Sequence, residues 1–386
     1  MIERRKSRTV WVGKVALGGG NPIVVQSMTN TPTSDVAATV TQIRALARAG
    51  CEIVRVAVPD LASAEAIREI KKEVDMPIVA DIHYDYRLAL AALSAGADKL
   101  RLNPGNIRDP EKIRIVSQAA KEKGVPIRVG VNAGSVDARF LGRKGEITPE
   151  GLVRAALWEV ELLEKEGFRD IVVSIKAHDV PLTVEANRLL AQEGDWPIHL
   201  GITEPGPELE GIVRSAVGIG ILLAEGIGDT LRVSLPGDPV REVEVAWEIL
   251  KALGIRKRGP SFVVCPTCGR TGIDIPGIAA EAKRRLSDLA VPVSIAIMGC
   301  PVNGLGEAER ADFAILGGKG FGTLYAHGKV VQAKVPEERL VEELVKLVRG
   351  GWEDERGHGQ SCGENGSSRV PHRGSAGPLH PWPKPD

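Results

Sequence analysis

The chain has 386 residues, of which 43% are hydrophobic, and this is enough to bury the core of one large domain or of two domains. Its 50 Lys and Arg residues equal its 50 Asp and Glu residues, which excludes the net positive charge that draws proteins to nucleic acids or anionic membranes. The longest weakly polar stretch, residues 215–224, is far shorter than the roughly 20 residues of a membrane-spanning helix. Since the N-terminal residues also lack the apolar segment of an export signal, we expect a cytoplasmic protein.

From residue 22 to residue 253, short β-rich segments alternate with segments of helical periodicity. The eight predicted strands are residues 22–27, 52–58, 77–83, 99–103, 126–132, 170–176, 197–203 and 230–236. This repeated alternation is typical of a (β/α)8 TIM barrel, and a doubly wound open sheet would be favoured only if two strands were misassigned. We therefore predict an α/β fold with a TIM-barrel substrate-binding domain over residues 1–253.

The pattern changes after a short linker, residues 254–260. Residues 261–265, 291–300 and 311–316 resemble strands, residues 322–335 resemble a hairpin that turns at His327-Gly328, and residues 277–290 and 336–350 have helical periodicity. These elements predict a smaller α+β domain over residues 261–350. Residues 351–386 are rich in Gly and Pro and nearly lack large aliphatic side chains, so we expect a disordered tail.

The predicted strand ends, where TIM barrels hold their active sites, carry many cations. The polar residues there are Arg55, Asp81, His83, Arg101, Asn103, Arg128, Asn132, Ser174, Lys176, Glu204, Arg232 and Ser234. Salt bridges at the rim would explain one or two of the cations, but each unpaired like-charge contact at ~4 Å costs on the order of 4 kcal/mol. Only Asp81 and Glu204 are expected as nearby carboxylates, so the pattern predicts a phosphorylated or diphosphorylated small-molecule substrate.

Three cysteines form a second candidate site, with Cys265 and Cys268 in CPTCGR and Cys300 in IMGCPVNG. The first pair alone fits half of a zinc knuckle, but no second pair follows, and the one His of this domain, His327, lies in the predicted hairpin. The spacing indicates an iron-sulfur cluster with an incomplete set of thiolate ligands. A carboxylate or the substrate would complete it; Glu307 is the obvious carboxylate, although a Glu in a Gly-rich turn is equally compatible with a solvated turn.

Longer motifs surround these residues, namely VQSMTNTPT, RLNPGNI, RVGVNAGS, GITEPG, RVSLPGDP, CPTCGRTGIDI and IMGCPVNGLGEAERADFAILGGKG. In these motifs the chain resembles the 4-hydroxy-3-methylbut-2-en-1-yl diphosphate synthases, iron-sulfur enzymes of the non-mevalonate isoprenoid pathway, over residues 1–350. Three features depart from the family pattern. Leu305 stands where Pro is usual, His178 stands where Ser is expected, and the tail after Gly350 has no family counterpart.

The resemblance implies a [4Fe-4S] cluster on Cys265, Cys268 and Cys300, with Glu307 as a displaceable fourth ligand. It also implies that 2-C-methyl-D-erythritol 2,4-cyclodiphosphate binds in the barrel mouth and that Glu204 orients or protonates the departing hydroxyl. The implied substrate-binding residues are Arg55, His83, Arg101, Arg128, Asn132, Lys176, Arg232 and Ser234. The family reaction is a reductive ring opening with loss of water, and flavodoxin or ferredoxin supplies the electrons one at a time. The resemblance further implies a homodimer.

Two other classes of function stay open on the sequence alone. One is a barrel enzyme of the pteroate-synthase or aldolase kind that carries a structural zinc ion. The other is a zinc-ribbon module over residues 260–350 that binds nucleic acid, for which the few aromatic residues of that segment make a poor base-stacking surface. We expect binding neither to nucleic acid nor to membranes.

Overall fold

The computed structural model describes residues 2–102, 107 and 109–357, and it divides into two compact units. Unit 1 consists of Met1–Gly259 with Asp288–Pro292, and unit 2 consists of Pro260–Ser287 with the chain from Val293 onward. Asn103 and the part of the predicted tail beyond Gly357 lie outside the described residues. The two units are described separately below.

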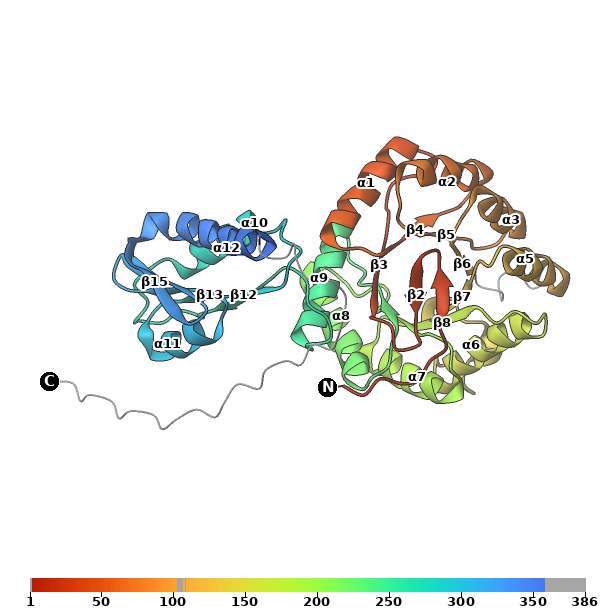
Figure 1. Ribbon diagram of the computed structural model, residues 1–386. Coiled ribbons are helices and arrows are strands. Elements are labelled where there is room, and N and C mark those ends of the chain that lie inside the picture. Colours follow the sequence, from red (N-terminus) through yellow and green to blue (C-terminus); the bar gives the residue numbers. More distant parts are fainter. Residues whose placement is uncertain (1, 103–106, 108, 358–386) are drawn as a thin grey trace, which may run out of the picture. The chain divides into compact units, whose positions relative to one another are not determined.

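Unit 1 is a barrel of parallel strands surrounded by helices (Figure 1). Among the described residues, eight strands follow one another in the order β8-β7-β6-β5-β4-β3-β10-β9, and a parallel bridge from Val173 to Ile198 nearly closes the ring. The strands are β3 (Val24–Met28), β4 (Ile53–Ala57), β5 (Ile78–Asp81), β6 (Lys99–Leu102), β7 (Ile127–Asn132), β8 (Ile171–Lys176), β9 (His199–Leu200) and β10 (Thr230–Leu231). The predicted TIM-barrel fold is therefore confirmed, although β9 and β10 are much shorter than predicted.

Helices cover the outside of this barrel. They are α1 (Val36–Ala49), α2 (Leu61–Glu73), α3 (Tyr86–Ala95), α5 (Pro110–Glu122), α6 (Pro149–Glu164), α7 (Val180–Glu193), α8 (Glu208–Ala224) and α9 (Pro239–Ala252). Many begin at an Asp whose carboxylate accepts a hydrogen bond from a first-turn N–H, as Asp35 does from Ala38 and Asp179 from Leu182. No helix in the described residues is both long and apolar enough to cross a membrane.

A short hairpin that was not predicted closes the N-terminal end of the barrel. Strands β1 (Val10–Val12) and β2 (Val15–Leu17) pair antiparallel. Their buried side chains form one apolar cluster with residues near the starts of four barrel strands, namely Val24, Ile53, Val79 and Val172. This end of the barrel interior is therefore apolar, and the polar side chains of the strands collect toward the opposite end.

Unit 2 contains a five-stranded sheet, in the described residues, with the order β11-β12-β13-β14-β15. Strands β11 (Pro260–Val264), β12 (Val293–Met298) and β13 (Phe313–Gly317) are parallel, whereas β14 (Phe321–Ala326) and β15 (Lys329–Pro336) extend the sheet antiparallel. The predicted hairpin turn is confirmed, because His327 and Gly328 have φ angles of 49° and 75°, as a two-residue turn requires. Helices α10 (Ile275–Arg285), α11 (Pro301–Arg310) and α12 (Leu340–Gly357) complete the smaller α+β unit.

Two details of unit 2 differ from the predictions. Residues 301–310 form helix α11 and not a Gly-rich turn, since Pro301 suits the first helical position and Gly304 packs closely on the sheet. A Cβ on Gly304 would lie 2.3 Å from Cδ1 of Leu316, so the glycine is needed for this close packing. Helix α12 also continues to Gly357, beyond the expected end at Gly350, because Gly350 does not adopt the left-handed conformation that ends many helices.

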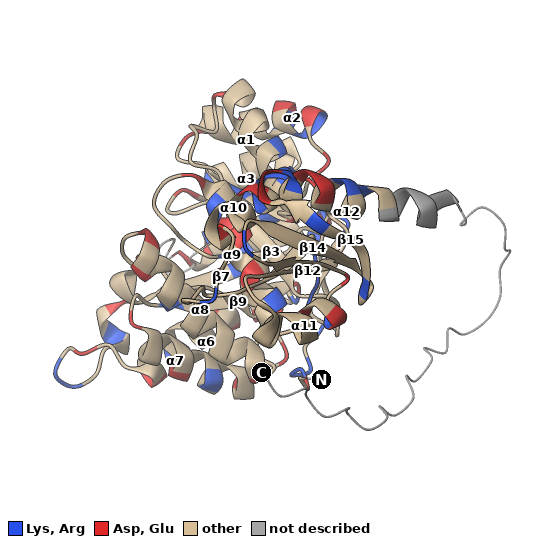
Figure 2. Cartoon of the chain, turned by 90° about the vertical axis from the view of Figure 1, so that its left-hand side faces the viewer, with Lys and Arg blue, Asp and Glu red and all other residues tan. Residues whose placement is uncertain are grey.

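Charges of both signs alternate on the helix surfaces, as Figure 2 shows around α2, α7 and α12. Several are pairs within one helix or at its end, such as Lys72 with Glu69 in α2 and Lys165 with Glu161 at the end of α6. Exposed pairs of this kind contribute only about 0.3–0.5 kcal/mol each. They do not decide the fold.

Candidate functional site

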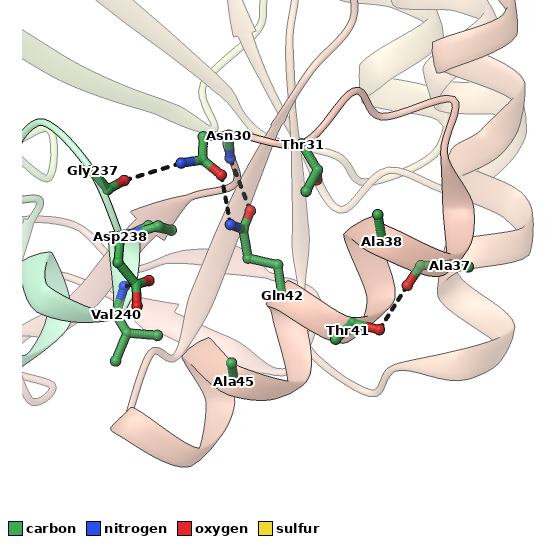
Figure 3. A pocket seen from close by; sticks show the side chains of 11 residues that line it. Asn30, Thr31, Ala37, Ala38, Thr41, Gln42, Ala45, Gly237, Asp238 and Val240 are labelled. Atoms are coloured by element: carbon green, nitrogen blue, oxygen red, sulfur yellow. Dashed lines mark hydrogen bonds between the residues drawn. The ribbon is translucent and has the colours of Figure 1, made fainter.

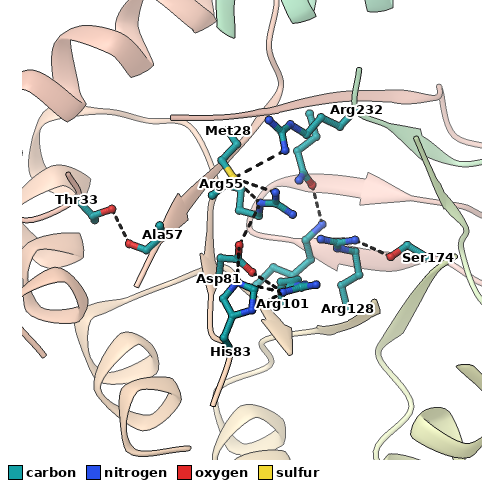
Figure 4. Close-up of polar contacts among 12 residues, drawn as sticks. Met28, Thr33, Arg55, Ala57, Asp81, His83, Arg101, Arg128, Ser174 and Arg232 are labelled. Carbon is teal, nitrogen blue, oxygen red and sulfur yellow. Dashed lines mark hydrogen bonds and ion pairs between the residues drawn. The ribbon is translucent and has the colours of Figure 1, made fainter. Parts of the chain in front are cut away.

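The C-terminal ends of the barrel strands bring the predicted cations together, and Figure 4 shows Arg55, Arg101, Arg128 and Arg232 converging between the strands. Strand register explains this, because Asp81 pairs with Arg101 and Arg101 pairs with Arg128 on successive parallel strands. Residues paired in this way face the same side of the sheet. Arg101 and Arg128 are 6% and 2% exposed, so these charges lie largely away from water.

Asp81 is the common partner of three side chains in the mouth. Its Oδ1 lies 3.2 Å from Nη1 of Arg101, and its Oδ2 lies 3.6 Å from Nε of Arg55 and 3.6 Å from Nε2 of His83. Burial alone would raise the pKa of Asp81, but the charge of Arg55 and the hydrogen bond from His83 outweigh it and hold the pKa well below its usual range. Asp81 is therefore a charged carboxylate that fixes the positions of Arg55 and Arg101.

A second carboxylate, Glu242 of α9, was not predicted. It accepts hydrogen bonds from Nη2 of Arg232 at 2.9 Å, from Nε of Arg232 at 3.1 Å and from Oγ of Ser27 at 2.9 Å. Glu204, which we expected as a carboxylate near the cations, is exposed and makes no hydrogen bond or ion pair within the described residues. The sequence did hold a signal, since helical periodicity places Glu242 on the buried face of α9 with Pro239 and Val243.

Arg128 and Lys176 have no carboxylate partner within the described residues. Nη1 of Arg128 donates to Oγ of Ser174 at 2.6 Å, while its Nε has no partner. Burial, followed by the charges of Arg55 and Arg101, pushes the pKa of Arg128 well below its ordinary value. Burial and the charge of Arg128 do the same to the pKa of Lys176, which is 7% exposed. Two buried cations that repel each other favour a bound anion.

Two glycines make room for these long side chains. A Cβ on Gly201, just after β9, would lie 2.6 Å from Nζ of Lys176 and 2.7 Å from the carbonyl oxygen of Arg232. A Cβ on Gly130 would lie 3.3 Å from both Nε of Arg101 and Oγ of Ser174. The glycines of RVGVN and GITEPG therefore allow the cationic side chains to lie across the barrel interior.

The other predicted site residues lie around this cluster. Asn132 pairs in register with Lys176 at the ends of β7 and β8, and Ser234 is half-buried in the segment after β10. His83 has a side chain that is 52% exposed above Asp81. Glu204 has a φ angle of 51°, which is uncommon for a residue other than glycine and is frequent at functional sites.

A groove of about 720 Å³ lies on unit 1 between α1 and residues 237–240 (Figure 3). Its polar side chains already bind one another. Nε2 of Gln42 donates to Oδ1 of Asn30 at 2.6 Å, and Nδ2 of Asn30 donates to the carbonyl oxygen of Gly237 at 3.0 Å. Because the groove offers none of the mouth cations, it is a weaker candidate for an anionic substrate than the barrel interior.

The three cysteines of unit 2 follow neighbouring parts of its sheet. Cys265 comes directly after β11, Cys300 follows the adjacent parallel strand β12, and the N–H of Cys265 donates to the carbonyl oxygen of Ile297 at 2.9 Å. Cys268 lies in the next turn, where its N–H donates to Oγ1 of Thr271 at 3.0 Å. Within the described residues, no three His, Cys, Asp or Glu side chains stand in a metal-binding arrangement. Three cysteine thiols that follow adjacent strands of one sheet are nonetheless the kind of ligand that iron-sulfur clusters use.

Arg270 lies among these thiols. Its guanidinium donates a hydrogen bond to Cys300, and this bond together with the nearby Cys268 raises the pKa of Arg270. At Cys300 a hydrogen bond from the N–H of Val302 lowers the pKa most, burial opposes it, and Arg270 adds to the lowering. The thiolate form, which is the form that binds iron, is therefore more accessible at Cys300 than at an ordinary cysteine.

Glu307 lies in α11, the helix that follows Cys300 directly. Cys300 is the extended residue before the first turn of that helix, and its side chain makes no capping hydrogen bond. Its Oε1 lies 3.9 Å from Nη1 of Arg310, a weak contact that leaves the carboxylate available. Glu307 therefore lies in a helix and not in the expected turn.

Comparison with known proteins identifies the family. Residues 7–247 match the family model described as the GcpE TIM-barrel domain, and residues 261–350 match the GcpE protein C-terminal domain. The chain belongs to the GcpE family. It is 54% identical to the 4-hydroxy-3-methylbut-2-en-1-yl diphosphate synthase (flavodoxin) of Caldanaerobacter subterraneus, over 90% of this chain and 98% of that protein. The protein of the same name from Symbiobacterium thermophilum is 54% identical, over 90% of this chain and 94% of that protein.

These matches confirm the family that the motifs predicted. GcpE enzymes are iron-sulfur oxidoreductases, in agreement with the predicted enzyme class. The cations of the barrel mouth lie in the part of the chain that matches the GcpE TIM-barrel domain. The three cysteines and Glu307 lie in the part that matches the GcpE C-terminal domain.

Proposed function

We propose that this chain catalyses the reductive ring opening and dehydration of 2-C-methyl-D-erythritol 2,4-cyclodiphosphate to 4-hydroxy-3-methylbut-2-en-1-yl diphosphate, a step of non-mevalonate isoprenoid biosynthesis. The names of its relatives agree with this reaction. The observation that carries the proposal is the excess of buried cations over carboxylates in the barrel mouth. Arg128 and Lys176 lack a carboxylate partner among the described residues, and a diphosphate supplies the missing negative charge.

In this proposal the mouth residues have distinct tasks. Arg128 and Lys176 bind the diphosphate directly, while Asp81 and Glu242 hold the remaining Arg side chains in position for it. The full set of proposed substrate-binding residues is Arg55, His83, Arg101, Arg128, Asn132, Lys176, Arg232 and Ser234. Because the charged groups are fixed before the substrate arrives, little side-chain ordering remains to oppose binding.

The cofactor that we propose is a [4Fe-4S] cluster held by Cys265, Cys268 and Cys300, with Glu307 as a displaceable fourth ligand. Such a cluster, when bound, supplies electrons one at a time. The overall reaction takes up two electrons and one proton, breaks the C–O bond that closes the ring, and releases one hydroxyl as water. Glu204, in the loop after β9, is the residue that we propose orients or protonates that hydroxyl.

The electron donor that we propose is flavodoxin, which the names of the relatives include, and ferredoxin is the alternative. Unit 2 has no dinucleotide-binding loop in its described residues, since the Gly-rich residues 317–322 connect β13 to β14 and do not precede a helix. We also propose that the enzyme works in the cytoplasm, where such donors are reduced.

We propose in addition that the enzyme is a homodimer. Helix α8 exposes four apolar side chains spaced four residues apart, namely Leu209, Val213, Val217 and Ile221, which are 71%, 51%, 47% and 36% exposed. A stripe of this kind is unusual on a surface that stays in water. A second copy of the chain would cover it, and Val213→Glu should then shift the sedimentation coefficient from that of a dimer to that of a monomer.

The decisive experiment is an anaerobic assay with the purified chain, the cyclic diphosphate and a one-electron reductant. We expect brown protein with an iron-sulfur absorption band and formation of the open-chain diphosphate. Colourless protein with stoichiometric zinc and no product would instead support a barrel enzyme with a structural zinc ion. Retention on single-stranded nucleic acid at physiological salt would favour the zinc-ribbon alternative.

A further inference from the structure

Beneath the mouth cations lies one more cation, Lys99, at the start of β6. Lys99 is two residues before Arg101, so both side chains face the barrel interior. The Lys99 side chain is 0% exposed, and its Nζ lies 3.3 Å from Oε1 of Gln26. Within the described residues it has no carboxylate partner. An ammonium group has three donors, so a charged Lys99 would be poorly compensated at this position.

The surroundings of Lys99 are strongly positive. The charged and titratable groups that face the barrel interior are Arg55 on β4, Asp81 on β5, Arg101 on β6, Arg128 on β7, Lys176 on β8, His199 on β9, and Arg232 with its partner Glu242. Both carboxylates already hold other cations, as described above. Burial first, and then the charges of Arg128 and Arg55, hold the pKa of Lys99 well below its ordinary value.

His199 does not relieve this excess of positive charge. Its ring is fully buried, and neither ring nitrogen has a hydrogen-bond partner. Burial, followed by the charge of Lys176, holds the pKa of His199 well below its ordinary value, so the ring is neutral near pH 7. Gln26 adds only a neutral amide, whose Nε2 also lacks a partner.

We propose that Lys99 is an uncharged amine in the free enzyme and takes up a proton when the anionic substrate binds in the mouth above it. The inference rests on the proposed function, since that function places the two negatively charged phosphates of the substrate among Arg128, Lys176 and their neighbours. The negative charge offsets the repulsion that keeps Lys99 uncharged, so its amine nitrogen binds a proton from solvent with no change of redox state.

This arrangement serves both states of the enzyme. A neutral Lys99 removes one repulsive charge from the free barrel, while a charged Lys99 adds an attractive charge once the substrate is bound. Lys99 is therefore a positioning residue that acts through the charge of the mouth and does not contact the substrate. By linkage, substrate affinity should fall as pH rises, by up to about tenfold per pH unit where one full proton is taken up.

Isothermal titration calorimetry on the unreduced holoenzyme tests the proposal, because no turnover occurs without electrons. Titrations in two buffers of different ionisation enthalpy give the number of protons taken up per bound cyclic diphosphate, and inorganic pyrophosphate serves as a second anion. We expect an uptake approaching one proton for the parent enzyme and near zero for Lys99→Met and Lys99→Gln. The matched control is Lys72→Met, on the surface of α2 beside Glu69, which should keep the parent value.

The outcomes separate cleanly. Binding of the cyclic diphosphate to the parent enzyme with no proton uptake overturns the proposal without any variant. Unchanged uptake in Lys99→Met or Lys99→Gln also overturns it, and loss of uptake in Lys176→Met alone would assign the proton to Lys176. Failure of the folded, cluster-loaded parent enzyme to bind either anion would instead count against the proposed substrate.

Discussion

The barrel mouth and the cysteine edge of unit 2 differ in how far the polypeptide alone prepares them for their ligands. In the mouth, strand register places the cations, and Asp81 and Glu242 hold Arg55, Arg101 and Arg232, as in the 2.9 Å contact between Arg232 and Glu242. At the cysteine edge, Cys268 is exposed in a turn, and the described thiols do not form a metal-binding arrangement. A site of buried charges must be preorganised to be stable, whereas a metal site is completed by the bonds that the metal forms.

The largest expected effect is the loss of the cluster when a cysteine of unit 2 is replaced. Cys300→Ser should abolish the iron-sulfur absorption and all product formation, because a hydroxyl is a poor substitute for a thiolate at iron. The matched control is Cys51→Ala, since Cys51 is buried in unit 1, where burial raises the pKa of its thiol to about 12 and keeps it protonated. Ultraviolet-visible spectra and iron content of both variants measure the effect. An intact spectrum in Cys300→Ser would contradict the ligand assignment.

The next effect is on turnover in the barrel. Glu204→Gln keeps the size of the side chain but removes its acidic proton, so turnover should fall by about 10² to 10⁴-fold with the cluster spectrum and the substrate Kd preserved. Single-turnover kinetics with pre-reduced enzyme separates this loss from slow electron delivery. Glu208→Gln, at the exposed start of α8, is the control and should turn over like the parent. Parent-like turnover in Glu204→Gln would refute its role.

A pair of substitutions then tests whether charge balance organises the mouth. Asp81→Asn leaves Arg55 and Arg101 without their carboxylate and should destabilise the fold by about 3–5 kcal/mol. Lys176→Met removes a buried cation that has no carboxylate partner in the described residues, so the apo enzyme should melt at a higher temperature while substrate binding weakens by about 2–5 kcal/mol. Calorimetric melting and binding titrations measure both effects. If Asp81→Asn and Lys176→Met both lowered the Tm, repulsion between the buried cations would not govern the stability of the mouth.

The contribution of Asp81 to the stability of the fold depends on pH. The folded-state pKa of Asp81 lies below that of the unfolded chain, so its stabilising contribution is fully present above about pH 4 and is lost as pH falls toward the folded-state pKa. The parent enzyme should therefore lose stability below about pH 4 more steeply than Asp81→Asn. Equal slopes for the two proteins in acid denaturation would show that Asp81 is not the titrating group.

The sequence predicted the barrel, the cations and the cysteines, because alternating strands and helices and polar strand ends are local patterns. It did not reveal Glu242, whose partner Arg232 lies ten residues earlier and meets it only through the tertiary packing of α9. It also misjudged residues 301–310, because several glycines suggested a turn, whereas the close packing of Gly304 on Leu316 makes a glycine suitable within a helix. Helical periodicity placed Glu242 on the buried face of α9, but its partner and the packing of Gly304 are tertiary contacts that local composition does not show.

The smallest effect concerns the space that the mouth cations need. In Gly201→Ala the new methyl group would stand 2.6 Å from Nζ of Lys176 and 2.7 Å from the carbonyl oxygen of Arg232, so both the lysine side chain and the backbone after β10 must move to avoid it. We expect KM to rise by roughly tenfold, which corresponds to about 1.4 kcal/mol, with the cluster spectrum unchanged. Gly350→Ala in α12 is the matched control, because a Cβ there has nothing within 4 Å. If Gly201→Ala kept the parent KM, the position of Lys176 would not limit substrate binding.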